Sequence, residues 1–127
     1  MPALLRALRP QEWVKNLLVF AGLLFSAKFR EFDAVVDATI TFAAFCMVAS
    51  AGYLVNDAHD VAEDRQHPTK RFRPIAAGEL RIPTAIGLAV VLAVIGLAGS
   101  AALEGLEVGG LVLAYGVGTT LYSYVLK

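Results

Sequence analysis

Three long apolar stretches constrain the fold of this chain more than any other feature. They run over 35–55, 82–103 and 108–126, and each approaches the ~20 residues that a helix needs to cross a bilayer. A shorter stretch, 14–27, precedes them. The chain is 57% hydrophobic and its mean hydropathy is +0.64, above what soluble domains usually show. We predict an all-α, polytopic transmembrane helix bundle with about four spans.

The short apolar stretch over 14–27 could be a signal peptide instead of a membrane helix. It is short and contains Lys15 and Asn16, and Arg6 and Arg9 precede it, as in the basic flank of a signal peptide. Against this, no small-x-small cleavage site follows it, and Trp13 near Lys15 is typical of an interfacial anchor on a retained helix. We therefore expect a membrane helix here.

Small residues recur in the last two predicted spans. Examples are Gly96 in one, and Gly109, Gly110 and Gly116 in the other. Small side chains let helix backbones approach closely in a membrane. We expect these positions to pack helices within one bundle, although a dimer surface is the alternative.

Basic residues lie mainly on one side of the predicted spans, although the formal net charge is zero. That side carries Arg6, Arg9, Lys15, Arg65, Lys70, Arg71, Arg73, Arg81 and Lys127. The opposite connections carry only Lys28 and Arg30 as basic residues. The positive-inside rule then places both termini in the cytoplasm, in a multi-pass protein of the plasma membrane.

An acidic segment follows the second predicted span directly. If the helix continues at about 100° per residue, four side chains fall within roughly one quarter-turn. These are Asn56, Asp57, Asp60 and Asp64. Carboxylates crowded at the edge of hydrocarbon repel one another and are costly to desolvate, so a cation is expected among them. Hard oxygen ligands favour Mg²⁺, which takes one or two carboxylates and leaves other positions to waters and substrate phosphates.

A basic loop, 65–74, comes next, and Pro68 and Pro74 break any continuing helix. Taken alone, such a loop is explained by topology or by contact with anionic lipid. Beside carboxylates arranged for a metal, its Lys and Arg side chains can neutralise and bind phosphate oxygens. The two segments together predict a Mg²⁺–diphosphate site, in which metal and cations stabilise the charge on a departing diphosphate.

The spacing Asn-Asp-x-x-Asp-x-x-x-Asp over 56–64 resembles the first aspartate-rich motif of the UbiA superfamily of intramembrane prenyltransferases. The sequences of 67–78 and 9–16 are similar to one branch of that family. In that branch, a 5-phosphoribosyl group moves from phosphoribosyl pyrophosphate to a polyprenyl phosphate such as decaprenyl phosphate, for cell-wall arabinan synthesis. The resemblance therefore implies a transferase that uses Mg²⁺.

The resemblance also implies roles for individual residues. The expected Mg²⁺ ligands are Asn56, Asp57, Asp60 and Asp64. The three aspartates are the expected catalytic residues, with Asp57 and Asp60 ranked first, and Asn56 is also expected to bind substrate. Lys70 and Arg73 are the expected phosphate partners in the loop. Lys15 is a third candidate because it lies at the same membrane level, with interfacial snorkelling as its alternative.

Helical geometry indicates whether two further residues, Tyr122 and His59, could belong to the site. Tyr122 shares a helix face with Tyr115, seven residues earlier, and is a candidate substrate-binding residue; its alternative role is an interface anchor. His59 falls on the side of the helix opposite Asp57 and Asp60, so we expect it to be a surface or packing histidine with no role in the site.

Superfamily members have about nine membrane helices, and a second aspartate-rich motif in a later loop completes their metal site. Residues 1–127 contain no second acidic cluster. We expect them to be the N-terminal part of a UbiA-type domain, either a fragment or a truncated homologue that needs a partner for the remaining half. Such a chain is not expected to catalyse transfer unaided.

Two other functions stay open. One is a UbiA-type prenyltransferase that moves a prenyl group from a prenyl diphosphate to an aromatic acceptor. The other is a non-catalytic membrane protein or inactive homologue, in which the acidic segment and basic loop only form a salt-bridge cap. We expect the lipid bilayer, polyprenyl phosphate and phosphoribosyl pyrophosphate as partners, and no nucleic acid.

Overall fold

The computed structural model describes residues 2–18, 20–21 and 31–125, and within these ranges the chain is all-α, as predicted. Its elements are α1 (Ala3–Leu8), the 3₁₀ helix η1 (Pro10–Leu18), α3 (Phe32–His59), α4 (Val61–Arg65), the 3₁₀ helix η2 (Lys70–Phe72), α5 (Ile82–Glu104) and α6 (Leu106–Val125).

The three long helices correspond to the last three predicted spans. α3 and α5 are long and apolar enough to cross a membrane, and α6 carries a shorter apolar helical stretch, Leu106–Tyr122. The first predicted span, 14–27, begins within η1, and most of its remainder lies outside the described residues. Three of the predicted spans are therefore helices, and the first stays a prediction.

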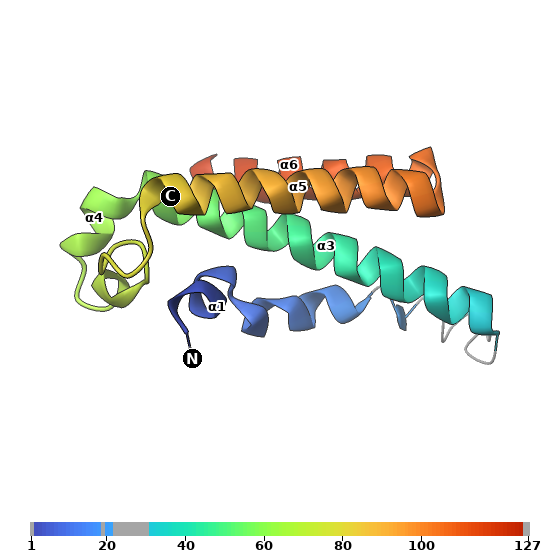
Figure 1. Cartoon of the computed structure of the whole chain (residues 1–127), viewed down its shortest axis with the longest axis horizontal. Helices are drawn as coiled ribbons and strands as arrows, with labels where there is room; N and C mark the ends of the chain where they lie inside the picture. Colours follow the sequence, from blue (N-terminus) through green and yellow to red (C-terminus); the bar gives the residue numbers. More distant parts are fainter. Residues whose placement is uncertain (1, 19, 22–30, 126–127) are drawn as a thin grey trace.

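α3 is the central helix of the bundle. α5 and α6 run side by side, α3 packs against both, and α1 and η1 lie along the opposite side of α3 (Figure 1). Small and aliphatic side chains fill the contact between α3 and α5, including Ala51, Leu54, Ala85 and Ala89. Large aliphatic side chains on α5 and α6 point outward, as expected of helices in contact with lipid or with further helices.

Glycines set how closely the long helices approach. A Cβ atom on Gly96 would lie 3.3 Å from the backbone oxygen of Ala44 on α3. A Cβ atom on Gly109 would lie 2.8 Å from Cβ of Ala101 and 3.1 Å from its Cα atom, on α5. Close packing within one bundle, as the sequence predicted, is confirmed at these positions.

One helical prediction is wrong in a detail that matters for the site. The helix does not run unbroken through 56–64: α3 ends at His59 and α4 begins at Val61. Asp60, between them, has φ −94° and ψ 14°. The amide of Asp60 still donates to the carbonyl of Asn56 at 3.0 Å, and the amide of Asp64 donates to that of Asp60 at 2.8 Å. The chain therefore bends at Asp60 while keeping its helical hydrogen bonds.

Gly109 and Gly110 offer a matched pair of variants in α6. Gly109→Ala should destabilise the bundle by about 1–3 kcal/mol, because the new methyl group collides with the backbone of Ala101. Gly110→Ala should be neutral or slightly stabilising, because nothing lies within 4 Å of its Cβ position. Thermal or denaturant unfolding in detergent micelles measures both; equal stability of the two variants would contradict this packing.

Candidate functional site

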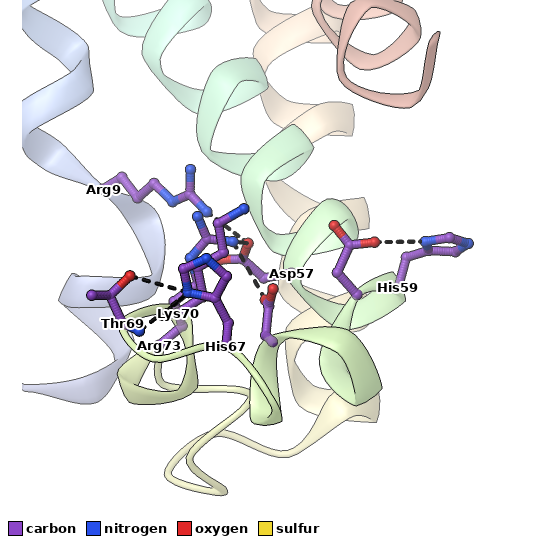
Figure 2. Close-up of polar contacts among 9 residues, drawn as sticks. Arg9, Asp57, His59, His67, Thr69, Lys70 and Arg73 are labelled. Atoms are coloured by element: carbon purple, nitrogen blue, oxygen red, sulfur yellow. Dashed lines mark hydrogen bonds and ion pairs between the residues drawn. The ribbon is translucent and has the colours of Figure 1, made fainter. Parts of the chain in front are cut away.

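The site is centred on Asp57, in the last turn of α3. Its side chain is 2% exposed, so its charge needs a partner. Two guanidinium groups supply it: Arg9 donates from Nη2 to Oδ1 at 2.6 Å, and Arg73 donates from Nη1 to the same oxygen at 3.2 Å. Figure 2 shows Arg9 reaching this carboxylate from the N-terminal segment and Arg73 from the loop after α4.

Arg73 joins a second carboxylate to this cluster. Its Nη1 also donates to Oδ2 of Asp64 at 3.4 Å, and Asp64 is 4% exposed. Two buried carboxylates and two guanidinium groups thus form one ion-paired cluster, which we call the Asp57 cluster: Arg9, Asp57, Asp64 and Arg73. Removing one member of a buried pair leaves an uncompensated charge and typically costs about 3–5 kcal/mol.

Asp60, at the junction of α3 and α4, has a described partner outside the Asp57 cluster. Oδ1 of Asp60 lies 3.0 Å from Nδ1 of His59, and Figure 2 shows His59 on the side of the helix away from Arg9. Asn56 lines a small pocket with Tyr53, Tyr115 and residues of α6. The structure therefore brings Asp57 and Asp64 together and gives Asp60 and Asn56 other surroundings. His59 faces away from Asp57, as helical geometry indicated, but the prediction that it also lies opposite Asp60 is wrong, because the two side chains are in contact.

The other predicted residues lie outside the described contacts of the Asp57 cluster. Lys15 pairs with Glu12 at 2.5 Å and its side chain is 75% exposed. Lys70 is exposed in η2. Tyr122 is 68% exposed on α6, whereas Tyr115 donates its hydroxyl hydrogen to Oδ1 of Asn16 at 3.0 Å. Of Lys15, Lys70 and Arg73, the predicted phosphate-binding cations, Arg73 is the one with described contacts to Asp57 and Asp64.

Local hydrogen bonds fold the basic loop back toward α3. Nδ1 of His67 accepts from the amides of Thr69 and Lys70, each at 3.1 Å, and so orders the start of η2. Nε of Arg65 donates to the carbonyl of Ala76 at 3.0 Å and ties α4 to the end of the loop. Arg73 lies between these two anchors, which explains how the loop returns its guanidinium group to Asp57 and Asp64.

Arg9 is the member of the cluster that sequence reasoning missed as a site residue. Its position depends on contacts between the N-terminal segment and the middle of α3. Ser50, 1% exposed, donates to the carbonyl of Leu8 at 2.7 Å and accepts from Nε1 of Trp13 at 2.9 Å. The sequence signal was that Arg9 and Trp13 both belong to the 9–16 segment that carried the family resemblance.

The donor set suits a Mg²⁺ ion that is bound mainly by substrate oxygens. Among the residues that the structure describes, no three acidic, histidine or cysteine side chains converge as a metal-binding group. Two buried carboxylates, Asp57 and Asp64, share one guanidinium group, and Mg²⁺ commonly binds through one or two carboxylates plus phosphate oxygens. Asp57 and Asp64 therefore fit a Mg²⁺ ion that takes two protein carboxylates and completes its coordination with phosphate oxygens and water.

The UbiA prenyltransferase family model matches residues 16–127. The chain belongs to the UbiA prenyltransferase family. With the long apolar helices of the structure, this makes it a membrane protein of a polytopic, all-α family. The matched residues include α3, the Asp57 cluster apart from Arg9, and both α5 and α6.

Several curated relatives of this UbiA-family chain carry the same name. Decaprenyl-phosphate phosphoribosyltransferase of Corynebacterium glutamicum is 49% identical over 117 residues, covering 91% of the chain and 34% of the relative. The proteins of that name from Mycolicibacterium smegmatis and Mycobacterium tuberculosis strain H37Rv are 47% identical over 95 residues and 46% identical over 99 residues. These matches cover 72% and 75% of the chain, and 30% and 33% of the relatives. The chain thus spans about a third of the length of these relatives.

Ser50 provides a test of how the N-terminal segment is held. Ser50→Ala should leave the carbonyl of Leu8 and the indole N–H of Trp13 without this partner, at a cost of about 1–3 kcal/mol. Hydrogen–deuterium exchange should then rise across 3–18 and stay unchanged in α6. Thr119→Ala is the control, because its hydroxyl bonds only within its own helix. Unchanged exchange in Ser50→Ala would contradict this anchoring.

Proposed function

We propose that the chain carries the donor-binding part of a Mg²⁺-dependent intramembrane transferase. It would move a 5-phosphoribosyl group from phosphoribosyl pyrophosphate to decaprenyl phosphate or a similar polyprenyl phosphate, in cell-wall arabinan synthesis. The observation that carries the proposal is the Asp57 cluster, in which buried carboxylates and guanidinium groups meet at the end of a membrane helix in a UbiA-family chain. The shared name of the curated relatives supports the choice of donor and acceptor.

The proposed reaction is a displacement of diphosphate by a phosphate oxygen of the lipid. The bond between the anomeric carbon of ribose and a diphosphate oxygen breaks, and diphosphate leaves with the electron pair. A phosphate oxygen of the lipid forms the new bond to that carbon. Arg9 and Arg73 can each donate paired N–H groups to the leaving diphosphate, which guanidinium groups do better than ammonium groups. Fixed cations at the leaving group stabilise the charge that develops there.

Asp57 and Asp64 would hold the Mg²⁺ ion, with Asp60 and Asn56 as the further ligands that the family motif implies. When bound, the ion neutralises charge on the diphosphate oxygens. The remaining ligands would come from the diphosphate and from water, as is usual for this ion. We also propose substrate contacts for three further residues: Lys15, Lys70 and Tyr122.

An apolar groove supports a lipid acceptor. It measures about 380 Å³, lies between α3, α5 and α6, and is lined by aliphatic side chains such as Val55, Val90 and Leu113. Gly52 and Thr120 line both this groove and the small pocket of Asn56. An apolar chain in the groove would therefore approach the same end of the bundle as the acidic residues.

We further propose that the protein lies in the plasma membrane. The positive-inside rule would then place the Asp57 cluster on the cytoplasmic side. Residues 1–127 would be the N-terminal part of a UbiA-type domain, and the other part of the fold would complete the metal site. Transfer activity is accordingly expected of the protein as its gene encodes it, and not of residues 1–127 alone.

Asp57→Asn tests the proposal. Isothermal titration of the detergent-solubilised protein, as its gene encodes it, should show phosphoribosyl pyrophosphate binding only with Mg²⁺. The substitution should weaken that binding at least about tenfold, because it removes a charged ligand. Glu63→Gln, an exposed acid on α4, should leave binding unchanged. Thermal unfolding of both variants separates lost binding from lost folding.

The same titration with a short prenyl diphosphate distinguishes the other functions. Preference for the prenyl compound would assign the protein to prenyl transfer toward an aromatic acceptor. Failure to bind either diphosphate would favour a non-catalytic salt-bridge cap.

A further inference from the structure

Arg9 stands out by its backbone. It follows the last residue of α1 with φ 53° and ψ 62°, and it is the one non-glycine residue with positive φ among those described. This left-handed conformation at a helix end normally selects glycine, because a Cβ atom crowds the following carbonyl. Pro10 comes next and restricts the conformation of Arg9 further. An arginine here indicates that its side chain is needed at this position.

The guanidinium group of Arg9 is held from two sides. It lies 4.6 Å from the centroid of the Tyr53 ring, within cation–π distance, and donates to Oδ1 of Asp57 at 2.6 Å. Ser50 binds the carbonyl of Leu8, in the peptide bond that leads into Arg9. Backbone and side chain therefore both direct this cation onto the carboxylate, and its side chain is only 19% exposed.

The contact places Arg9 on an oxygen that a metal ion would need. Oδ1 of Asp57 already accepts from both Arg9 and Arg73. A divalent cation that enters alone must displace at least one guanidinium group or lie beside it, and like charges in a buried site repel strongly. A diphosphate changes this balance, because its oxygens offer the displaced guanidinium group a bidentate partner.

We propose that Arg9 closes Asp57 to free divalent cations and releases it when a metal arrives with diphosphate. The inference rests on the proposed function and adds an order of events to it: metal and donor bind together, and the metal does not bind first. Arg9 thereby has two effects of opposite sign, because it weakens binding of the metal alone and strengthens binding of the metal–diphosphate pair.

Three variants separate these effects. Arg9→Asn removes the charge, and asparagine tolerates the left-handed backbone, so the turn is preserved. Arg9→Lys keeps the charge but loses the planar fork. Arg6→Asn is the matched control, because Arg6 lies on α1 and pairs with Glu79 in an exposed ion pair.

Two measurements on the detergent-solubilised protein, as its gene encodes it, read the two effects separately. Electron paramagnetic resonance with MnCl₂ alone reports metal binding without donor. Arg9→Asn should tighten Mn²⁺ binding about tenfold, since one of two competing cations is gone. Arg9→Lys should keep Mn²⁺ binding within about threefold of the wild type, since its charge still opposes the metal.

Isothermal titration with Mg²⁺ and phosphoribosyl pyrophosphate reports the donor complex. Arg9→Asn should weaken it about 10- to 100-fold, the range expected for a lost charged hydrogen bond. Arg6→Asn should change neither measurement.

The opposite signs make the inference falsifiable. If Arg9→Asn weakens both kinds of binding, Arg9 only supports the fold; if Mn²⁺ binding is unchanged, Arg9 does not guard Asp57. Either result overturns the inference. Absence of donor binding in the wild type would refute the proposed function instead, and the Mn²⁺ measurement would still test the role of Arg9.

Discussion

The burial of the Asp57 charge is the constraint on which the rest of this structure depends. A carboxylate with 2% exposure at the end of an apolar helix must be neutralised, and the cations come from residues 48 positions before it and 16 positions after it. Pairing with Arg9 holds the N-terminal segment against α3, and pairing with Arg73 holds the loop under α4. One buried charge thus gathers three segments of the chain at one end of the bundle.

The bend at Asp60 then divides the acidic motif. Asp57 and Asp64 are seven residues apart, nearly two helical turns, and remain close enough to share Arg73. Asp60 contacts His59 instead. Cations of the protein itself pair with two of the carboxylates that the family motif offers to a metal. This is consistent with a site whose metal arrives together with negatively charged substrate oxygens.

The chain belongs to the UbiA prenyltransferase family, and the metal–diphosphate reaction that we propose for it needs carboxylates and cations in one place. The chain spans about a third of the curated relatives that carry the phosphoribosyltransferase name. Outward-facing aliphatic side chains on α5 and α6 leave ample surface for lipid or for further helices. The proposed role of these residues is donor binding.

The sequence by itself determined the helices, because a run of about 20 apolar residues is a local property that fixes length and solvent together. It also placed Asp57 and Asp64 in one acidic motif with Arg73 close behind them, all within 17 residues of chain. Only the tertiary structure decided that Arg9 completes the cluster and that Asp60 leaves it. Arg9 reaches Asp57 because Ser50 and Tyr53 hold the N-terminal segment in place, and such contacts across 40 or more residues have no local signature. Asp60 pairs with His59 at the junction of α3 and α4, and helical periodicity alone does not contain the choice of that partner.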